Sequence, residues 1–219
     1  MIGCLSGTRA VETEKGLEKI VVSYDPSLVT KAIHIFRHPL DNIVARFHLE
    51  FKVQGERGNT QFGKDFPRNA IGFHRWCASD DHNRRILESH LMDDKLKAKM
   101  RVIPCFNDFY RYVSWHNLAF AVSTHMNIPT MILHYHEYEE DFEAARDRVL
   151  DWIGLPHAGE GEPFHPGKIY RDYYTDDQKR LIRDFLKEAS SAETWQQLEN
   201  YEWTDDVQEA DEDSGFATE

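Results

Sequence analysis

The chain has 219 residues, enough for one domain with a sizeable core, and its hydrophobic fraction of 41% excludes a disordered protein. No apolar run approaches the ~18 residues needed to cross a bilayer, so we expect no membrane contact by this chain. Residues 199–219 supply nine of the twelve net negative charges. We therefore expect an acidic, disordered tail over 202–219, a nearly neutral domain over 1–201, and no nucleic-acid partner.

Three cysteines are present, Cys4, Cys77 and Cys105, and none stands in a C-x-x-C pair, so the sequence gives no zinc signal. Cys77 and Cys105 form one disulfide in an oxidising compartment, or they are two buried thiols. The sequence leaves both alternatives open.

The N-terminal residues 1–19 are polar, and we expect them to be irregular. The triplet Ser6-Gly7-Thr8 lacks the Lys and the glycine spacing of a Walker loop, so we do not interpret it as a phosphate loop. Residues 19–25 are predicted to form a strand that Pro26 ends.

Residues 32–36 are mostly apolar and are predicted to form a short buried strand, which ends at Arg37. Pro39 and Asp41 are typical of a first helical turn, and apolar residues then recur at helical spacing at Ile43, Val44, Phe47 and Phe51. This arrangement places the donor fork of Arg37 beside a helix N-terminus, which is a favourable site for a phosphate. Alternatively, Arg37 is a surface residue paired with Asp41 or Glu50.

The next segments predict a mainly helical region. Residues 52–66 contain three glycines among charged residues and are predicted to form a loop. Apolar spacing from Pro67 to about Lys99 predicts two helices that join near Asp80 and Asp81, and residues 106–126 predict a strong amphipathic helix. We expect the aromatic residues of that helix to lie in the core, with His116 a candidate for contact with a substrate.

The remaining pattern is strand and then helix. Residues 128–135 predict a buried strand and residues 139–155 a helix. Residues 176–189 predict another helix, which Thr175 and Gln178 begin with a capping box. His134, His136 and Glu137 could be taken for metal ligands. His134 and His136 share a face because alternate residues of a strand do, but the sequence identifies no third ligand on that face, and we expect no metal.

Several of these segments resemble the sulfotransferases that use 3′-phosphoadenylyl sulfate (PAPS). The segment "IHIFRHPLDNIVARFHLEF" (33–51) is similar to the family's 3′-phosphate-binding strand, turn and helix. Similar in the same order are "FYRYVSWHNLAFAV" (109–122), "MILHYHEYEEDFEAARDRVLDWIGLP" (131–156) and the closing segment 165–175.

The resemblance implies roles for particular residues. Arg37 would hold the 3′-phosphate of the cofactor, and Ala45 stands at the position of the family's assisting Ser, with Arg46 beside it as a possible substitute. Tyr24 stands where many members have the His that acts as general base, although a Tyr with a pKa near ~10 is a poor base. In the segment that closes over the 3′-phosphate, the nearest matches are Gly167 and Lys168.

The resemblance also implies an α/β fold with a central parallel sheet flanked by helices, related to nucleotide kinases and lacking the N-terminal 5′-phosphosulfate loop. The implied reaction is transfer of a sulfuryl group from PAPS to a hydroxyl or amine of a carbohydrate or small-molecule acceptor, without a metal.

Two other function classes stay open. One is a catalytically inactive fragment that binds a nucleotide or a partner, and the other is a metal-dependent hydrolase built on His134, His136 and Glu137. The sequence leaves the location undecided: cytoplasmic as it stands, or the Golgi lumen if a preceding segment carries an anchor.

Overall fold

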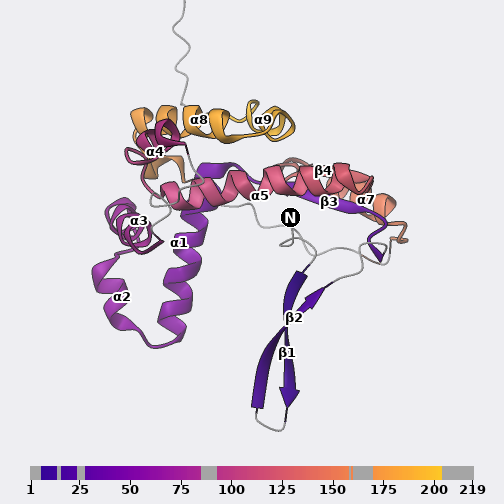
Figure 1. Cartoon of the computed structure of the whole chain (residues 1–219), viewed down its shortest axis with the longest axis horizontal. Helices are drawn as coiled ribbons and strands as arrows, with labels where there is room; N and C mark the ends of the chain where they lie inside the picture. The colour runs from indigo at the N-terminus through magenta and orange to yellow at the C-terminus, as the bar shows by residue number, and fades with distance from the viewer. Residues whose placement is uncertain are drawn as a thin grey trace, which may run out of the picture.

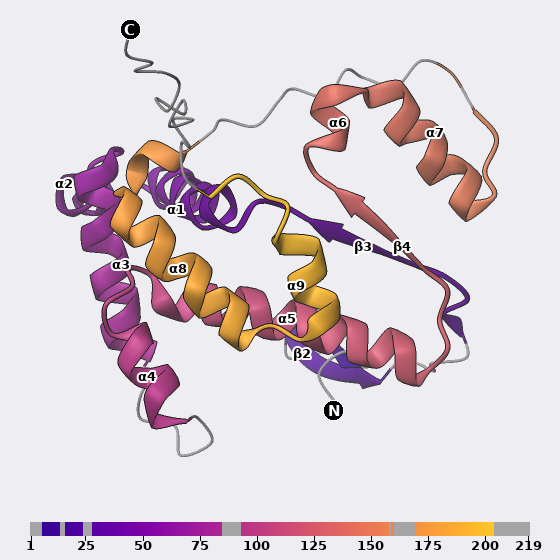
Figure 2. The same cartoon turned by 90° about the horizontal axis from the view of Figure 1, so that it is seen from above.

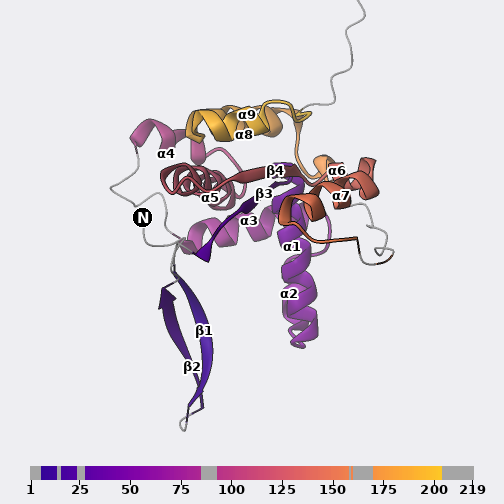
Figure 3. The same cartoon turned by 90° about the vertical axis from the view of Figure 1, so that its right-hand side faces the viewer.

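Two parallel strands, β3 (Ala32–Phe36) and β4 (Thr130–His134), pair in register from Ala32 opposite Thr130 to Phe36 opposite His134. They come from a computed structural model that describes residues 6–13, 16–23, 28–84, 93–157, 159 and 170–203. Figures 2 and 3 show this small sheet between α5 on one side and α6 and α7 on the other. Within the described residues the fold is therefore mixed α/β but mainly helical, with a smaller parallel sheet than the sequence predicts.

The helices fill most of the remaining described chain. In order they are α1 (Pro39–Glu56), α2 (Thr60–Asp65), α3 (Ala70–Arg84), α4 (Asp94–Met100), α5 (Phe106–His125), α6 (Glu137–Glu140), α7 (Phe142–Ile153), the 3-10 turn η3 (Arg171–Tyr173), α8 (Asp176–Ala189) and α9 (Ala192–Leu198). The predicted helices over 106–126 and 176–189 are confirmed as α5 and α8. The helix predicted over 139–155 is divided into α6 and α7, because Asp141 leaves helical geometry and caps α7.

The first helix, α1, forms where the sequence predicts it. His38 is its N-cap and Pro39 occupies the first helical position, where the missing N–H of proline costs no hydrogen bond. The buried residues of α1 recur at helical spacing, so one face lies in the core; they include Leu40, Ile43, Val44 and Phe47.

Three local predictions are wrong. Residues 52–66 are not a loop, because α1 continues to Glu56 and Asn59 then caps the separate helix α2. The two helices after Pro67 do not join near Asp80, since α3 runs through that position to Arg84. Residues 1–19 are not irregular throughout: β1 (Ser6–Thr13) and β2 (Gly16–Ser23) pair as an antiparallel hairpin.

The hairpin settles two N-terminal predictions. Ser6-Gly7-Thr8 lies within β1, so it is not the phosphate loop that the sequence also argues against, nor is it irregular as predicted. The strand predicted over 19–25 corresponds to β2, which begins at Gly16 and ends at Ser23. Figure 1 shows the hairpin extending away from the helices. It pairs with neither β3 nor β4, so among the described residues it adds no strand to the parallel sheet.

The core lies between α1, α3, α5 and α8, which bury large apolar side chains against one another. Fully buried members include Phe47, Phe73, Phe109, Phe185 and Leu186. A disulfide joins Cys77 of α3 to Cys105, the N-cap of α5, and resolves the alternative that the sequence leaves open. The cross-link stabilises the fold because it lowers the conformational entropy of the unfolded chain.

The C-terminal residues after α9 remain part of the folded unit through Trp203. The indole of Trp203 is buried and donates to the carbonyl of Leu198 at 3.2 Å, and the Tyr201 hydroxyl contacts Nδ1 of His134 at 2.9 Å. The domain therefore extends past the predicted boundary at 201. The rest of the predicted tail, 204–219, lies outside the described residues.

The capping box of α8 is confirmed, because the Thr175 hydroxyl accepts from the backbone of Gln178 and the Gln178 side chain accepts from the backbone of Thr175. Thr175→Ala is expected to lower the free energy of unfolding by about 1 kcal/mol, since it leaves a first-turn N–H without its partner. Urea denaturation would measure this difference. Thr175→Ser keeps the hydroxyl and serves as the control; an equal loss in both variants would contradict the capping role.

In the part of the chain that the structure describes, every helix is too short or too polar to span a bilayer.

Candidate functional site

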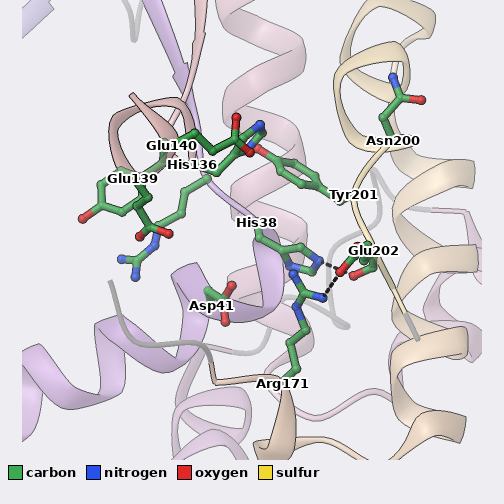
Figure 4. Close-up of a pocket in the computed structure, with 11 residues that line it drawn as sticks. His38, Asp41, His136, Glu139, Glu140, Arg171, Asn200, Tyr201 and Glu202 are labelled. Carbon is green, nitrogen blue, oxygen red and sulfur yellow. Dashed lines mark hydrogen bonds and ion pairs between the residues drawn. The ribbon is translucent and has the colours of Figure 1, made fainter. Parts of the chain in front are cut away.

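A cleft of about 300 Å³ opens beyond the carboxyl ends of β3 and β4, where ligands bind in open α/β sheets. We call it the Arg37 cleft. Figure 4 shows its side chains coming from the start of α1, the β4–α6 turn, α6, η3 and the segment after α9. Its lining residues are Arg37, His38, Asp41, Tyr135, His136, Glu139, Glu140, Arg171, Asn200, Tyr201 and Glu202.

Arg37 is held in this cleft by its neighbours in the sheet. It follows Phe36, whose carbonyl accepts from the N–H of Tyr135 at 2.7 Å, so the first residues beyond β3 and β4 lie side by side. The guanidinium of Arg37 lies over the Tyr135 ring, 4.7 Å from its centroid. The Tyr112 hydroxyl donates to the Arg37 carbonyl at 2.8 Å and fixes the backbone there. The Tyr135 ring therefore positions the guanidinium of Arg37, and Tyr112 of α5 positions its backbone.

The helix N-terminus offers fewer donors than the sequence suggests. Pro39 has no N–H, and the N–H of Leu40 donates to Nδ1 of His38 at 3.2 Å. The N–H of Asn42 donates to the carbonyl of His38 at 2.9 Å. An anion in the cleft would therefore depend on arginine side chains more than on the first turn of α1.

A second arginine, Arg171, enters the cleft from η3. The turn is fixed beside α1 because the Asp41 carboxylate accepts from the N–H of Tyr170 at 2.7 Å. One terminal nitrogen of Arg171 donates to Glu202 at 2.9 Å, and its Nε is buried without a hydrogen-bond partner among the described residues. The Glu202 side chain is mostly exposed, so this ion pair is weak and easily exchanged for another anion.

His38 closes the inner wall of the cleft. Its Nε2 lies 2.9 Å from the carbonyl of Glu202, and its ring contacts Tyr201 and Trp203. Burial is the largest influence on this ring and lowers the pKa of His38 to about 4, although the carbonyl contact opposes the shift. His38 is therefore uncharged at neutral pH and acts as a structural link between α1 and the C-terminal segment.

The cleft carries both signs of charge. Arg37 and Arg171 face four carboxyl groups, those of Asp41, Glu139, Glu140 and Glu202. Burial raises the pKa of Asp41, and its bond from Tyr170 and the two arginines partly offset that shift. Because Glu202 neutralises Arg171, an incoming anion competes with it for the guanidinium.

The sequence-predicted site residues divide into three groups. Arg37 lines the cleft. Ala45 and Arg46 lie further along α1 and do not line it; Arg46 instead pairs with Asp108 of α5, whose side chain is buried. The positions predicted for the base and for the closing segment, Tyr24, Gly167 and Lys168, lie outside the described residues.

The candidate metal ligands are engaged in other contacts. The ring of His134 has Tyr201 at 2.9 Å and Gln197 at 3.3 Å as partners of its two nitrogens. Glu137 accepts from the N–H of His134 at 2.6 Å and pairs with Arg148 at 2.6 Å. Over the described ranges, the structure contains no group of three His, Cys, Asp or Glu side chains placed to hold a metal ion.

Sequence reasoning missed Arg171, His38 and Tyr135. Arg171 stands three residues after Lys168, so the segment was identified but the cationic residue within it was not. His38 directly follows Arg37, and Tyr135 directly follows His134. Both lie in the turns after β3 and β4, and both line the cleft. A rule that inspects the first two residues after every parallel strand would have found both.

Comparison with known proteins returned no match from protein-family models, from curated proteins or from solved structures.

Proposed function

We propose that the Arg37 cleft binds the 3′-phosphate of PAPS and that the chain is a sulfotransferase or derives from one. In this proposal Arg37 and Arg171 grip the phosphate from two sides. The acceptor is a hydroxyl or amine of a carbohydrate or small molecule, and no metal takes part.

The observation that carries the proposal is the convergence of two arginines at the carboxyl ends of parallel strands. Arg37 and Arg171 come from opposite ends of the domain, and both line the same cleft. A planar guanidinium matches the oxygens of a phosphate with two parallel hydrogen bonds, and a pair of them is suited to a doubly charged group. The order of segments that resemble PAPS sulfotransferases supports the same ligand.

The buried, unpartnered Nε of Arg171 gives further support. A donor without an acceptor costs free energy when it is buried, and a bound anion that accepts from it removes that cost. Rotation of Glu202 into solvent would free the terminal nitrogen of the same guanidinium. Arg171 would then offer its full fork to the ligand.

The direct test is calorimetric titration of the full chain with adenosine 3′,5′-bisphosphate and, as the matched ligand, 5′-AMP, which lacks the 3′-phosphate. We expect the bisphosphate to bind at least about tenfold more tightly, because a charge-assisted bidentate contact is lost with 5′-AMP. Equal affinity for the two nucleotides, or no binding of either by a folded sample, would contradict the proposal.

A binding module without catalysis is the second candidate, and Tyr24 favours it, because a Tyr stands where many members of the family have the His that acts as general base. The two candidates share the cleft and differ in turnover. Incubation with radiolabelled PAPS and a panel of sugars would distinguish them, since only the enzyme releases adenosine 3′,5′-bisphosphate and labels an acceptor.

A further inference from the structure

A second cavity, of about 420 Å³, lies against the Arg37 cleft. Arg37 and Tyr135 line both cavities, so this pair forms the partition between them. The other lining residues of the second cavity come from β3, α1 and α5; they are Ile35, Asn42, Tyr112, Trp115 and His116. This volume is typical of small-ligand sites, and the cavity is large enough for one sugar ring.

One wall of the second cavity is an exposed aromatic surface. The indole of Trp115 is 56% exposed, and Ile35 beside the cavity is 49% exposed. The rings of His34 and His116 contact Trp115 edge-on, with centroids 5.4 Å and 5.0 Å from its own. A large, positioned aromatic face left open to solvent is suited to stacking against a ligand ring.

The second cavity is also lined by three polar side chains, those of Arg37, Asn42 and His116. His116 is buried, and its Nδ1 lies 2.6 Å from Nε2 of His34. Nε2 of His116 has no hydrogen-bond partner in the described part of the chain, and Nδ1 of His34 is buried without one. Because no further partner fixes the tautomers, either ring can donate in the His34–His116 bond.

This freedom determines what His116 offers to a ligand. If Nδ1 of His116 donates to His34, Nε2 of His116 is an acceptor; in the other tautomer Nε2 is a donor. Burial and, as the smaller cause, the neighbouring His34 lower the pKa of His116 to about 3. The ring therefore stays uncharged at neutral pH and is a hydrogen-bond partner rather than an effective proton acceptor.

We propose that the second cavity binds the acceptor as a sugar ring, with Trp115 as the stacking surface and His116 as the partner of a ring hydroxyl. The inference rests on the proposed function, because it places the acceptor beside the cofactor cleft. A hydroxyl both donates and accepts, so it suits His116 in either tautomer. Three polar side chains around one aromatic face fit a ring that carries several hydroxyls better than they fit a phenol, which has one.

The test is saturation-transfer NMR on the full chain with methyl β-galactoside and methyl β-N-acetylglucosaminide, with phenol as the competing ligand class. Trp115→Ala is expected to weaken binding of the sugar by about threefold to tenfold, the range for one aromatic contact. The matched control is Leu49→Ala, which also removes an exposed apolar side chain (61% exposed) but lies on α1 outside both cavities. The control should leave sugar binding unchanged.

A parallel titration with adenosine 3′,5′-bisphosphate separates this inference from the proposed function. If the bisphosphate binds normally to both variants but neither sugar binds, or if Trp115→Ala leaves sugar binding intact, the second cavity is not the acceptor site. Stronger binding of phenol than of either sugar would also overturn it. Trp115-dependent sugar binding without bisphosphate binding would support the cavity and contradict the sulfotransferase proposal.

Discussion

Arg37→Ala is expected to weaken the binding of adenosine 3′,5′-bisphosphate by roughly a hundredfold, because it removes a bidentate, charge-assisted contact from a partly enclosed site. The substitution should leave the fold intact. The contact that fixes this turn runs from the Tyr112 hydroxyl to the backbone carbonyl of Arg37, which alanine retains. Calorimetry would measure the affinity, and thermal unfolding would check the fold.

Three further variants make this result specific to the cleft. Arg57→Ala removes an exposed arginine at the other end of α1 and should leave the affinity unchanged. Arg37→Lys keeps the charge without the planar fork and should lie between wild type and Arg37→Ala. Glu202→Gln should raise the affinity, because it releases Arg171 from its ion pair. A loss in Arg57→Ala as large as that in Arg37→Ala would point to nonspecific charge attraction instead.

The second large effect concerns the pH dependence of stability. As the pH falls from 6.5 to 4, wild type is expected to lose about 3 kcal/mol of unfolding free energy relative to His38→Asn. The pKa of His38 is about 4 in the fold, against about 6.5 in the unfolded chain, because the ring is buried. Between these values the unfolded state binds the additional proton. The contribution of His38 is therefore fully present above pH 6.5 and is lost as the pH falls towards 4.

Asparagine is the informative replacement because it does not titrate and is a favourable N-cap for α1. Urea denaturation at several pH values would give the two stability curves. Curves that run parallel from pH 7 to pH 4 would show that His38 is not buried as the structure places it.

Asp81 is expected to make stability depend on pH in the opposite direction to His38. Burial raises the pKa of its carboxyl to about 7, although the N–H of Asn107 donates to it at 3.0 Å. The folded state thus favours the protonated acid, and this contribution is present below about pH 4 and lost as the pH rises through 7. Relative to Asp81→Asn, wild type should therefore become less stable as the pH rises, the reverse of the His38 comparison.

Local sequence patterns determined much of the secondary structure. The apolar periodicity of residues 106–126 gave α5, and Thr175 with Gln178 gave the start of α8, because a helix that buries one face and has its first N–H groups capped forms from neighbouring residues alone. The same reasoning failed at residues 52–66. Glycines and charged residues are typical of a loop, but α1 extends through Glu56 and the Asn59 side chain begins α2.

The candidate site was only partly predictable for the same physical reason. Arg37 was identifiable because a strand end, an arginine and a helix start lie consecutively in the chain. Arg171 joins it through the bond between Asp41 and the N–H of Tyr170. Tyr201 lines the cleft and contacts His134, while the buried ring of Trp203 contacts His38. These contacts span more than 60 residues, so no local pattern encodes them. The sequence determined the helices, the strand ends and one arginine, whereas long-range packing decided which side chains share a cavity.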